Sequence, residues 1–143
     1  MSVSLVDTHC GLADESDAMR WRRTFPGRTD QSRPARHFVA FLLAGCPLGD
    51  DAVSVAGELV ANALTHTHSA KPGGLFVVEV RRWRGGAAVA VTDQGGTSEP
   101  TIREADGLAE SGRGLHTVNV LTGRWSWTGD ASSRTVTAVF DEH

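Results

Sequence analysis

The chain has 143 residues and a mass of 15.2 kDa, which corresponds to one ordinary domain and leaves no room for a large second one. Hydrophobic residues make up 40% and charged residues 22%, a globular rather than a disordered composition. Lys and Arg number 14 against 17 Asp and Glu, and the net charge of −3 argues against a general nucleic-acid binder. Lys71 is the only lysine, so chemistry that depends on a lysine is nearly excluded.

The N-terminal part separates into a leader and the start of a domain. Residues 1–19 are mixed and weakly periodic, and we interpret them as a loose N-terminal leader, with residues 20–143 forming a single domain. A basic cluster opens this domain; its six arginines are Arg20, Arg22, Arg23, Arg28, Arg33 and Arg36. The cluster is either a solvated surface or a docking patch for an acidic partner. Within it, residues 21–25 predict a short edge strand, ended by Pro26-Gly27.

Two helices are expected next. Pro34 lies in the first turn of a helix whose apolar residues recur with helical spacing, and Gly45-Cys46-Pro47 ends it. Asp50 caps a second helix, which runs to about Thr67 and has one apolar face.

The C-terminal half is rich in strand patterns. Four strands are expected, at residues 75–80, 87–92, 124–128 and 135–140. They form two antiparallel hairpins, separated by a long polar connector at residues 97–111 and a short helix that Gly123 ends. Helices followed by hairpins predict an α+β fold, a two-layer α/β sandwich with a mixed, mostly antiparallel sheet and helices on one face.

Glu58, Asn62 and His66 follow one another at four-residue spacing, so they form one polar stripe along the second helix. A carboxylate can take a proton from an attacking hydroxyl group, and an Asn oxygen suits the hard ion Mg²⁺. The stripe is therefore either a candidate site or an ordinary polar helix face.

The triplet His66-Thr67-His68 raises the alternative of zinc. Two-residue spacing at a helix end places the two rings on different sides, and a third ligand is not evident. A His near a helix C-terminus more often interacts with the last carbonyl groups. A metal-dependent hydrolase built on Glu58, His66 and His68 stays open as an alternative.

Two glycine clusters complete the candidate residues. Asp93 ends an apolar strand and precedes Gly95-Gly96, which places a carboxylate beside flexible backbone. Gly112-Arg113-Gly114 opens the predicted short helix, whose free N–H groups suit a phosphate. The chain contains neither a P-loop pattern nor a nucleophile elbow.

Taken together, these elements resemble a known superfamily. Residues 58–66, Asp93-Gln94-Gly95 and Gly112-Arg113-Gly114-Leu115 resemble the N, G1 and G2 boxes of the GHKL ATPase superfamily, which includes histidine kinases and gyrase. The chain is most similar to the anti-sigma-factor serine kinase branch, the RsbW/SpoIIAB-like regulators, and two further motifs resemble its actinobacterial members. These are Phe25-Pro26-Gly27 and Gly45-Cys46-Pro47. The resemblance covers residues 21–140 and implies the Bergerat ATP-binding fold.

The resemblance also implies a role for each matching residue. Glu58 would act as the general base on the attacking hydroxyl, and Asn62 would coordinate the Mg²⁺ that bridges the ATP phosphates. Asp93 would accept a hydrogen bond from the adenine amino group, and Gly95 would let the backbone approach the base. The remaining matches are Gly112, Arg113, Gly114 and Leu115 around the phosphates, Thr135 at the adenine pocket, His66 in a structural role and residues 97–111 as the ATP lid. Thr97 departs from the usual G1 pattern, D-x-G-x-G, and this affects the lid more than adenine binding.

The function implied is that of a Mg-ATP-binding anti-sigma factor and serine/threonine-protein kinase. It would phosphorylate a serine of a STAS-type anti-anti-sigma protein, sequester a sigma factor and so regulate transcription, as a homodimer. The alternative is a non-catalytic ATP-sensing module of the same fold. The two cysteines, Cys10 and Cys46, lack metal-ligand spacing, and no signal peptide or membrane span is evident, so we expect a cytoplasmic protein.

Overall fold

The computed structural model of the protein describes residues 2–5, 18–66, 70–95 and 124–141. The predicted lid at residues 97–111, the glycine cluster at 112–114 with its helix, Cys10 and His68 all lie outside the described residues.

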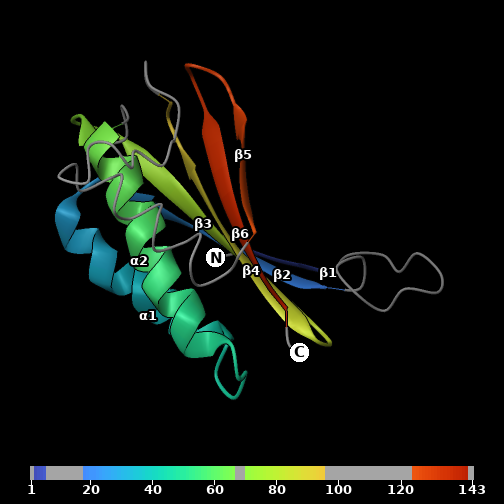
Figure 1. Cartoon of the computed structure of the whole chain (residues 1–143). Coiled ribbons are helices and arrows are strands. Elements are labelled where there is room, and N and C mark those ends of the chain that lie inside the picture. Colours follow the sequence, from blue (N-terminus) through green and yellow to red (C-terminus); the bar gives the residue numbers. More distant parts are fainter. Residues whose placement is uncertain (1, 6–17, 67–69, 96–123, 142–143) are drawn as a thin grey trace, which may run out of the picture.

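A six-stranded sheet forms one layer of the molecule (Figure 1). Its strands are β1 (Ser2–Leu5), β2 (Met19–Pro26), β3 (Leu75–Trp83), β4 (Gly86–Asp93), β5 (Trp125–Gly129) and β6 (Arg134–Asp141). The order across the sheet is β1-β2-β3-β4-β6-β5, and each neighbouring pair is antiparallel. The predicted antiparallel hairpins β3–β4 and β5–β6 are therefore confirmed, and β6 lies in the sheet beside β4.

Two predictions for the N-terminal region were wrong. Residues 2–5 of the expected leader form β1, which pairs with β2 from Ser2 opposite Arg22 to Leu5 opposite Met19. Consequently β2 is not an edge strand, because β1 covers its outer side and β3 its inner side. The Ser-Val-Ser-Leu segment alternates polar and apolar residues, as a strand does, but it is too short to stand out in the sequence.

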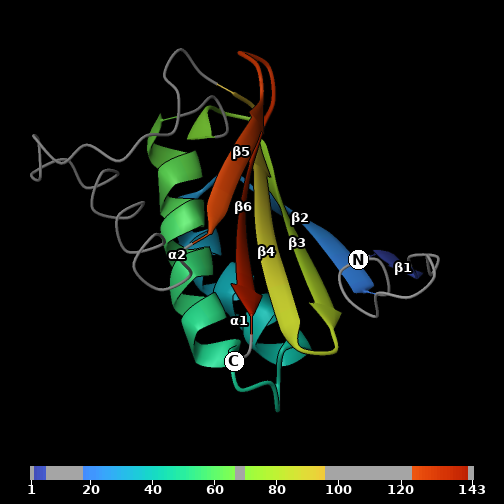
Figure 2. The same cartoon turned by 45° about the vertical axis from the view of Figure 1, so that its right-hand side comes forward.

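Two helices cover one face of the sheet, as expected (Figures 1 and 2). Helix α1 spans Ser32–Leu42, follows a short 3₁₀ turn, η2 (Thr29–Gln31), and carries Pro34 in its first turn, where a missing N–H group costs nothing. Helix α2 spans Gly49–His66 and packs on α1 and on β4. None of the helices in the described residues is long and apolar enough to cross a membrane.

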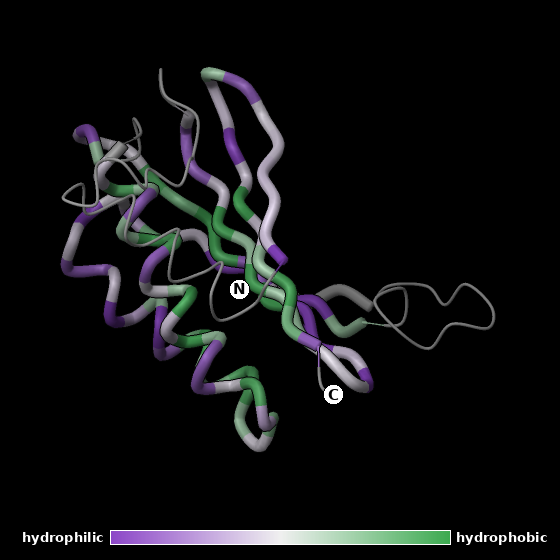
Figure 3. The backbone as a smooth tube through the Cα atoms, in the orientation of Figure 1, coloured by the Kyte–Doolittle hydropathy of each residue, from purple (hydrophilic) through white to green (hydrophobic). Residues whose placement is uncertain are grey.

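The core lies between the two layers, where the tube in Figure 3 is coloured as hydrophobic along the middle of the sheet. Phe25 of β2 stacks on Phe76 of β3 with ring centroids 5.3 Å apart, and Phe38 of α1 meets Phe25 edge-on at 6.1 Å. Trp125 and Trp127 share one side of β5 and pack against this core, as their alternating spacing predicts.

Strand alternation assigns each residue of β4 and β6 to one of the two faces of the sheet. In β6, Val136, Ala138 and Phe140 are buried in the core, so they face the helices. In β4, Val89 and Val91 do the same. The next residues of the same parity, at the ends of these strands, are the ones that form the site described below.

Candidate functional site

The C-terminal ends of α2 and β4 lie at the same end of the molecule (Figure 1). The chain passes from α2 through residues 70–74 into β3, whose beginning pairs with the end of β4 at Val77 and Thr92. The Leu75 N–H group also donates a hydrogen bond of 2.9 Å to the side-chain oxygen of Gln94. Helix α2 also packs on β4, so Glu58 and Asn62 and the end of β4 lie on facing elements.

The carboxylate of Asp93 is buried and paired with an arginine. The strand register places Asp93 opposite Arg134 of β6, and the Arg134 Nε atom lies 3.4 Å from Asp93 Oδ1. The Gly95 N–H group donates a hydrogen bond of 2.7 Å to the same oxygen. Since the Asp93 and Arg134 side chains are only 1% and 3% exposed, this ion pair is shielded from water.

The environment of Asp93 shifts its acidity. Burial raises the pKa of this carboxyl group above its usual value, because the charged form loses its hydration. The Gly95 N–H group and the positive charge of Arg134 act in the opposite direction and limit that rise of the pKa. A buried carboxylate with such specific partners is typical of a functional site.

Contacts within the protein require a glycine at position 95. Its φ is +73°, and a Cβ atom there would clash with the backbone of Ala131 in the turn between β5 and β6. Asp130 fixes this turn by accepting hydrogen bonds from the backbone N–H groups of Ser132 and Ser133 at 2.8 and 3.2 Å. The close approach expected of Gly95 is therefore made, in this structure, to the β5–β6 turn.

Thr135 lies on the other face of the sheet from Asp93. It is opposite Thr92 in the register, and the two hydroxyl oxygens are 2.7 Å apart in a hydrogen bond. Its role at an adenine pocket stays a prediction. The residue of β6 on the face of Asp93 is Arg134, which the motifs did not single out although the spacing of Val136 and Ala138 places position 134 on that face.

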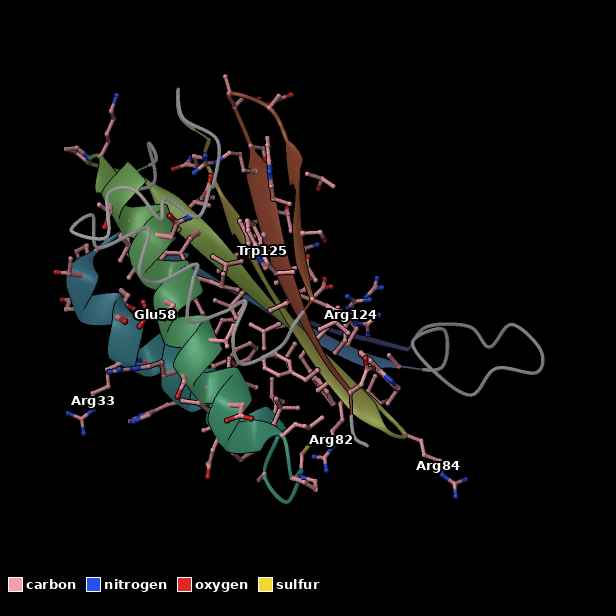
Figure 4. The ribbon with its side chains drawn as sticks, in the orientation of Figure 1. Arg33, Glu58, Arg82, Arg84, Arg124 and Trp125 are labelled. Atoms are coloured by element: carbon pink, nitrogen blue, oxygen red, sulfur yellow. The ribbon has the colours of Figure 1, made fainter. Side chains whose placement is uncertain are left out.

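Asn62 and Glu58 lie one turn apart on α2. Asn62 is 4% exposed and lies at the edge of the buried face of the helix, an uncommon place for an amide among apolar neighbours. Glu58 is half-buried at the border between that face and solvent (Figure 4). The burial of Asn62 and the partial burial of Glu58 place these two residues at the edge of the helix rather than on its exposed side.

The remaining predicted residues are not all described. Gly112, Arg113, Gly114 and Leu115 fall outside the described residues, as does one residue of the zinc alternative, His68. Among the residues that the structure describes, no group of three or more His, Cys, Asp or Glu side chains could hold a metal ion. The one described cysteine, Cys46, is a free thiol.

The fold and the site together define a class of protein: a two-layer α/β domain with a buried carboxylate at the end of a central strand, facing an Asn-bearing helix. A comparison with known protein families is consistent with this class, because residues 25–140 match the histidine kinase-like ATPase domain. The chain belongs to this family of ATP-binding domains within the GHKL superfamily. The search of curated proteins found no match to the chain.

The described residues fit part of a Mg-ATP complex. Mg²⁺ keeps several waters and takes few protein ligands besides the phosphates of its substrate, so a single oxygen from Asn62 is an appropriate contribution. Asp93 supplies a fixed hydrogen-bond acceptor, which suits a base with an amino group. Asn62 and Asp93 lie on facing layers, because α2 packs on β4.

Proposed function

We propose that the protein is a Mg-ATP-dependent serine/threonine kinase that acts on a partner protein and serves as an anti-sigma factor. The observation that carries the proposal is the family match over residues 25–140, combined with the buried carboxylate of Asp93. In this proposal Asp93 would contact the adenine amino group, Asn62 would hold Mg²⁺, and Gly112, Arg113, Gly114 and Leu115 would bind the phosphates. Bound by Asn62, Mg²⁺ would supply positive charge against the negative charge of the phosphoryl group.

Glu58 supplies the remaining chemistry. Its carboxylate takes the proton of the attacking serine hydroxyl group while the serine oxygen forms a bond to the γ-phosphorus. The bond from the γ-phosphorus to the bridging oxygen breaks, and that oxygen leaves as part of ADP. The partial burial of Glu58, one turn from Asn62 on α2, supports this role, because the carboxylate borders both the buried face of α2 and solvent.

The partner surface is smaller than the arginine cluster in the sequence. Arg20 and Arg22 lie 3.5 and 3.7 Å from Glu79 in ion pairs, and Arg28 pairs with Asp30 at 3.1 Å. Their charge is therefore partly neutralised within the protein, which reduces their value for steering a partner.

An open groove of about 700 Å³ remains between β2 and α1. It is lined by Arg23, Asp30, Arg33, Pro34, His37, Phe38 and Phe41. Phe41 is 77% exposed although it is a large apolar side chain, and Arg33 extends from α1 into solvent (Figure 4). Cations around an exposed aromatic ring favour an acidic partner segment with an apolar anchor. We assign this groove to the sigma factor or to the STAS-type antagonist, and we expect the protein to act as a homodimer.

One experiment tests the catalytic part of the proposal. The protein is incubated with labelled ATP, Mg²⁺ and a STAS-type protein, and transfer is compared with the variant Glu58→Gln. Loss of the general base should lower the transfer rate by about 10²- to 10⁴-fold without changing ATP affinity. Asp51→Asn is the matched control, because Asp51 is an exposed carboxylate on the same helix.

The outcomes separate the possible functions. ATP binding without transfer to any partner would assign the protein to the non-catalytic, ATP-sensing class. Failure of calorimetry to detect binding of ATP with Mg²⁺ would overturn the nucleotide assignment. Transfer that persists in Glu58→Gln would remove Glu58 from the chemistry and leave the kinase assignment standing.

A further inference from the structure

The pairing of Asp93 with Arg134 is difficult to explain by stability alone. Both side chains are almost completely buried, and each loses its hydration in the folded state. The attraction between two buried charges seldom exceeds this loss, and apolar residues of similar volume often serve equally well. A buried pair at the end of β4, beside the proposed nucleotide site, is better explained by what its carboxylate must do.

The geometry leaves one carboxylate oxygen for a ligand. An ionised carboxylate has two oxygens that both accept hydrogen bonds. Among the donors in the described residues, the Gly95 N–H group and the Arg134 Nε–H group both reach Oδ1, at 2.7 and 3.4 Å. Oδ2 of Asp93 is therefore the acceptor that remains for a bound molecule.

We propose that Arg134 is a positioning residue for base recognition, which holds Oδ1 of Asp93 and keeps the carboxylate charged so that Oδ2 accepts a hydrogen bond from a purine amino group. This inference rests on the proposed function, in which Asp93 contacts adenine. Because Oδ1 already accepts from Gly95 and Arg134, a proton taken up by this carboxyl group would lie on Oδ2 and face the amino group as a donor. Two donors do not bond to each other. Arg134 thereby sets the preference for adenine over a purine that lacks the amino group.

The strand register supports Arg134 over its neighbour. Arg134 and Thr135 both begin β6, but the Thr135 hydroxyl group is bonded to that of Thr92 at 2.7 Å on the helix-free face. Arg134 lies on the face of Asp93, with its side chain 3% exposed. It can therefore act on the carboxylate without contacting the base itself.

The test compares two nucleotides that differ in one group. Calorimetry with Mg²⁺ measures the affinities for ATP and for purine riboside triphosphate, which lacks the exocyclic amino group. The wild-type protein should prefer ATP by about 10- to 100-fold, the effect of one hydrogen bond to a charged group. In Arg134→Gln and Arg134→Met the preference should fall to about threefold or less, since little of that charged hydrogen bond remains.

Two controls separate positioning from folding. The affinity for purine riboside triphosphate should be unchanged in the Arg134 variants, whereas a structural defect would weaken both nucleotides equally. Arg134→Lys keeps the charge and should restore most of the preference. Arg124→Gln, which removes an arginine from an exposed ion pair with Asp141, should leave the preference as in the wild type.

Each result supports or overturns the inference. A folded Arg134→Gln or Arg134→Met protein that keeps the full preference for ATP would overturn it, as would unfolding of both variants, which would make Arg134 a purely structural residue. A wild-type protein that binds neither nucleotide would instead refute the proposed function. A wild-type protein that binds both equally would show that Asp93 does not read the amino group.

Discussion

The substitution Asp93→Asn tests whether the two charges of the buried ion pair stabilise each other in the folded protein. It removes the negative charge of Asp93 and with it the ion pair that this carboxylate makes with Arg134, whose side chain is 3% exposed. Removal of one partner of a buried pair costs about 3–5 kcal/mol. Because burial already disfavours the charged form of Asp93, part of that penalty is relieved, and we expect about 3 kcal/mol.

The same reasoning predicts the stability of the double variant. In Asp93→Asn/Arg134→Met both charges are gone, and uncharged replacements of buried pairs are often close to neutral. The free energy of unfolding should therefore recover by about 2 kcal/mol relative to Asp93→Asn alone, so the effects of the two substitutions should not be additive. Denaturant unfolding followed by circular dichroism measures all four proteins of this cycle.

An exposed ion pair provides the control. Arg124 Nη2 lies 2.6 Å from Asp141 Oδ2, a shorter distance than in the buried pair, but both side chains are about half exposed. Asp141→Asn should therefore cost no more than about 1 kcal/mol. If Asp93→Asn costs no more than this control, or if the effects at Asp93 and Arg134 are simply additive, burial does not govern the energetics of the pair.

Three further predictions concern the site and the partner groove. Gly95→Ala should lower the free energy of unfolding by more than about 1 kcal/mol, since a Cβ there meets the backbone of Ala131. Gly45→Ala is the control: Gly45 also has a positive φ, of +79°, but no atom lies near its Cβ position, so the loss in a melting experiment should be only about 1 kcal/mol. On acidification, the ratio of the affinity for ATP to that for purine riboside triphosphate should fall as the pH drops through the raised pKa of Asp93. Between that raised pKa and the ordinary pKa of an Asp, the contribution of Asp93 to the free energy of unfolding should rise as the pH falls. A ratio that stays constant down to the pH range of exposed carboxylates would contradict this. Phe41→Ser should change stability by less than about 0.5 kcal/mol, because Phe41 is 77% exposed, yet weaken binding of a STAS-type or sigma partner in a pull-down; unchanged binding would exclude the groove.

Periodicity predicted most of the fold. The apolar positions of α1, the hairpin β3–β4 and the two tryptophans of β5 all follow helical or alternating patterns, and the structure confirms them. The strand β1 was missed because a run of only four residues gives little signal, and its pairing with β2 depends on contacts across the chain rather than on a local turn.

The site shows where local patterns are insufficient. Asp93 and Asn62 were identified from their motifs, and the structure places them on facing layers. Arg134 escaped notice because a charged residue at the start of a strand is ordinarily solvated, and its burial follows from pairing with a carboxylate far away in the sequence. The same alternation that buries Val136 points Thr135 away from Asp93, which motif matching alone does not reveal.

The distance along the chain between Asp93 and Arg134 has a consequence for synthesis of the protein. The two residues are 41 positions apart, and Gly95 meets a turn that belongs to the same late hairpin, β5–β6. Such a long-range contact forms slowly, and a ribosome delivers Asp93 well before its partner. A nascent chain that has emerged only as far as β4 thus carries a carboxylate without its cation. With the proposed role of Asp93, competence for base recognition would arrive only with β6, so nucleotide binding would require synthesis of the chain as far as this strand.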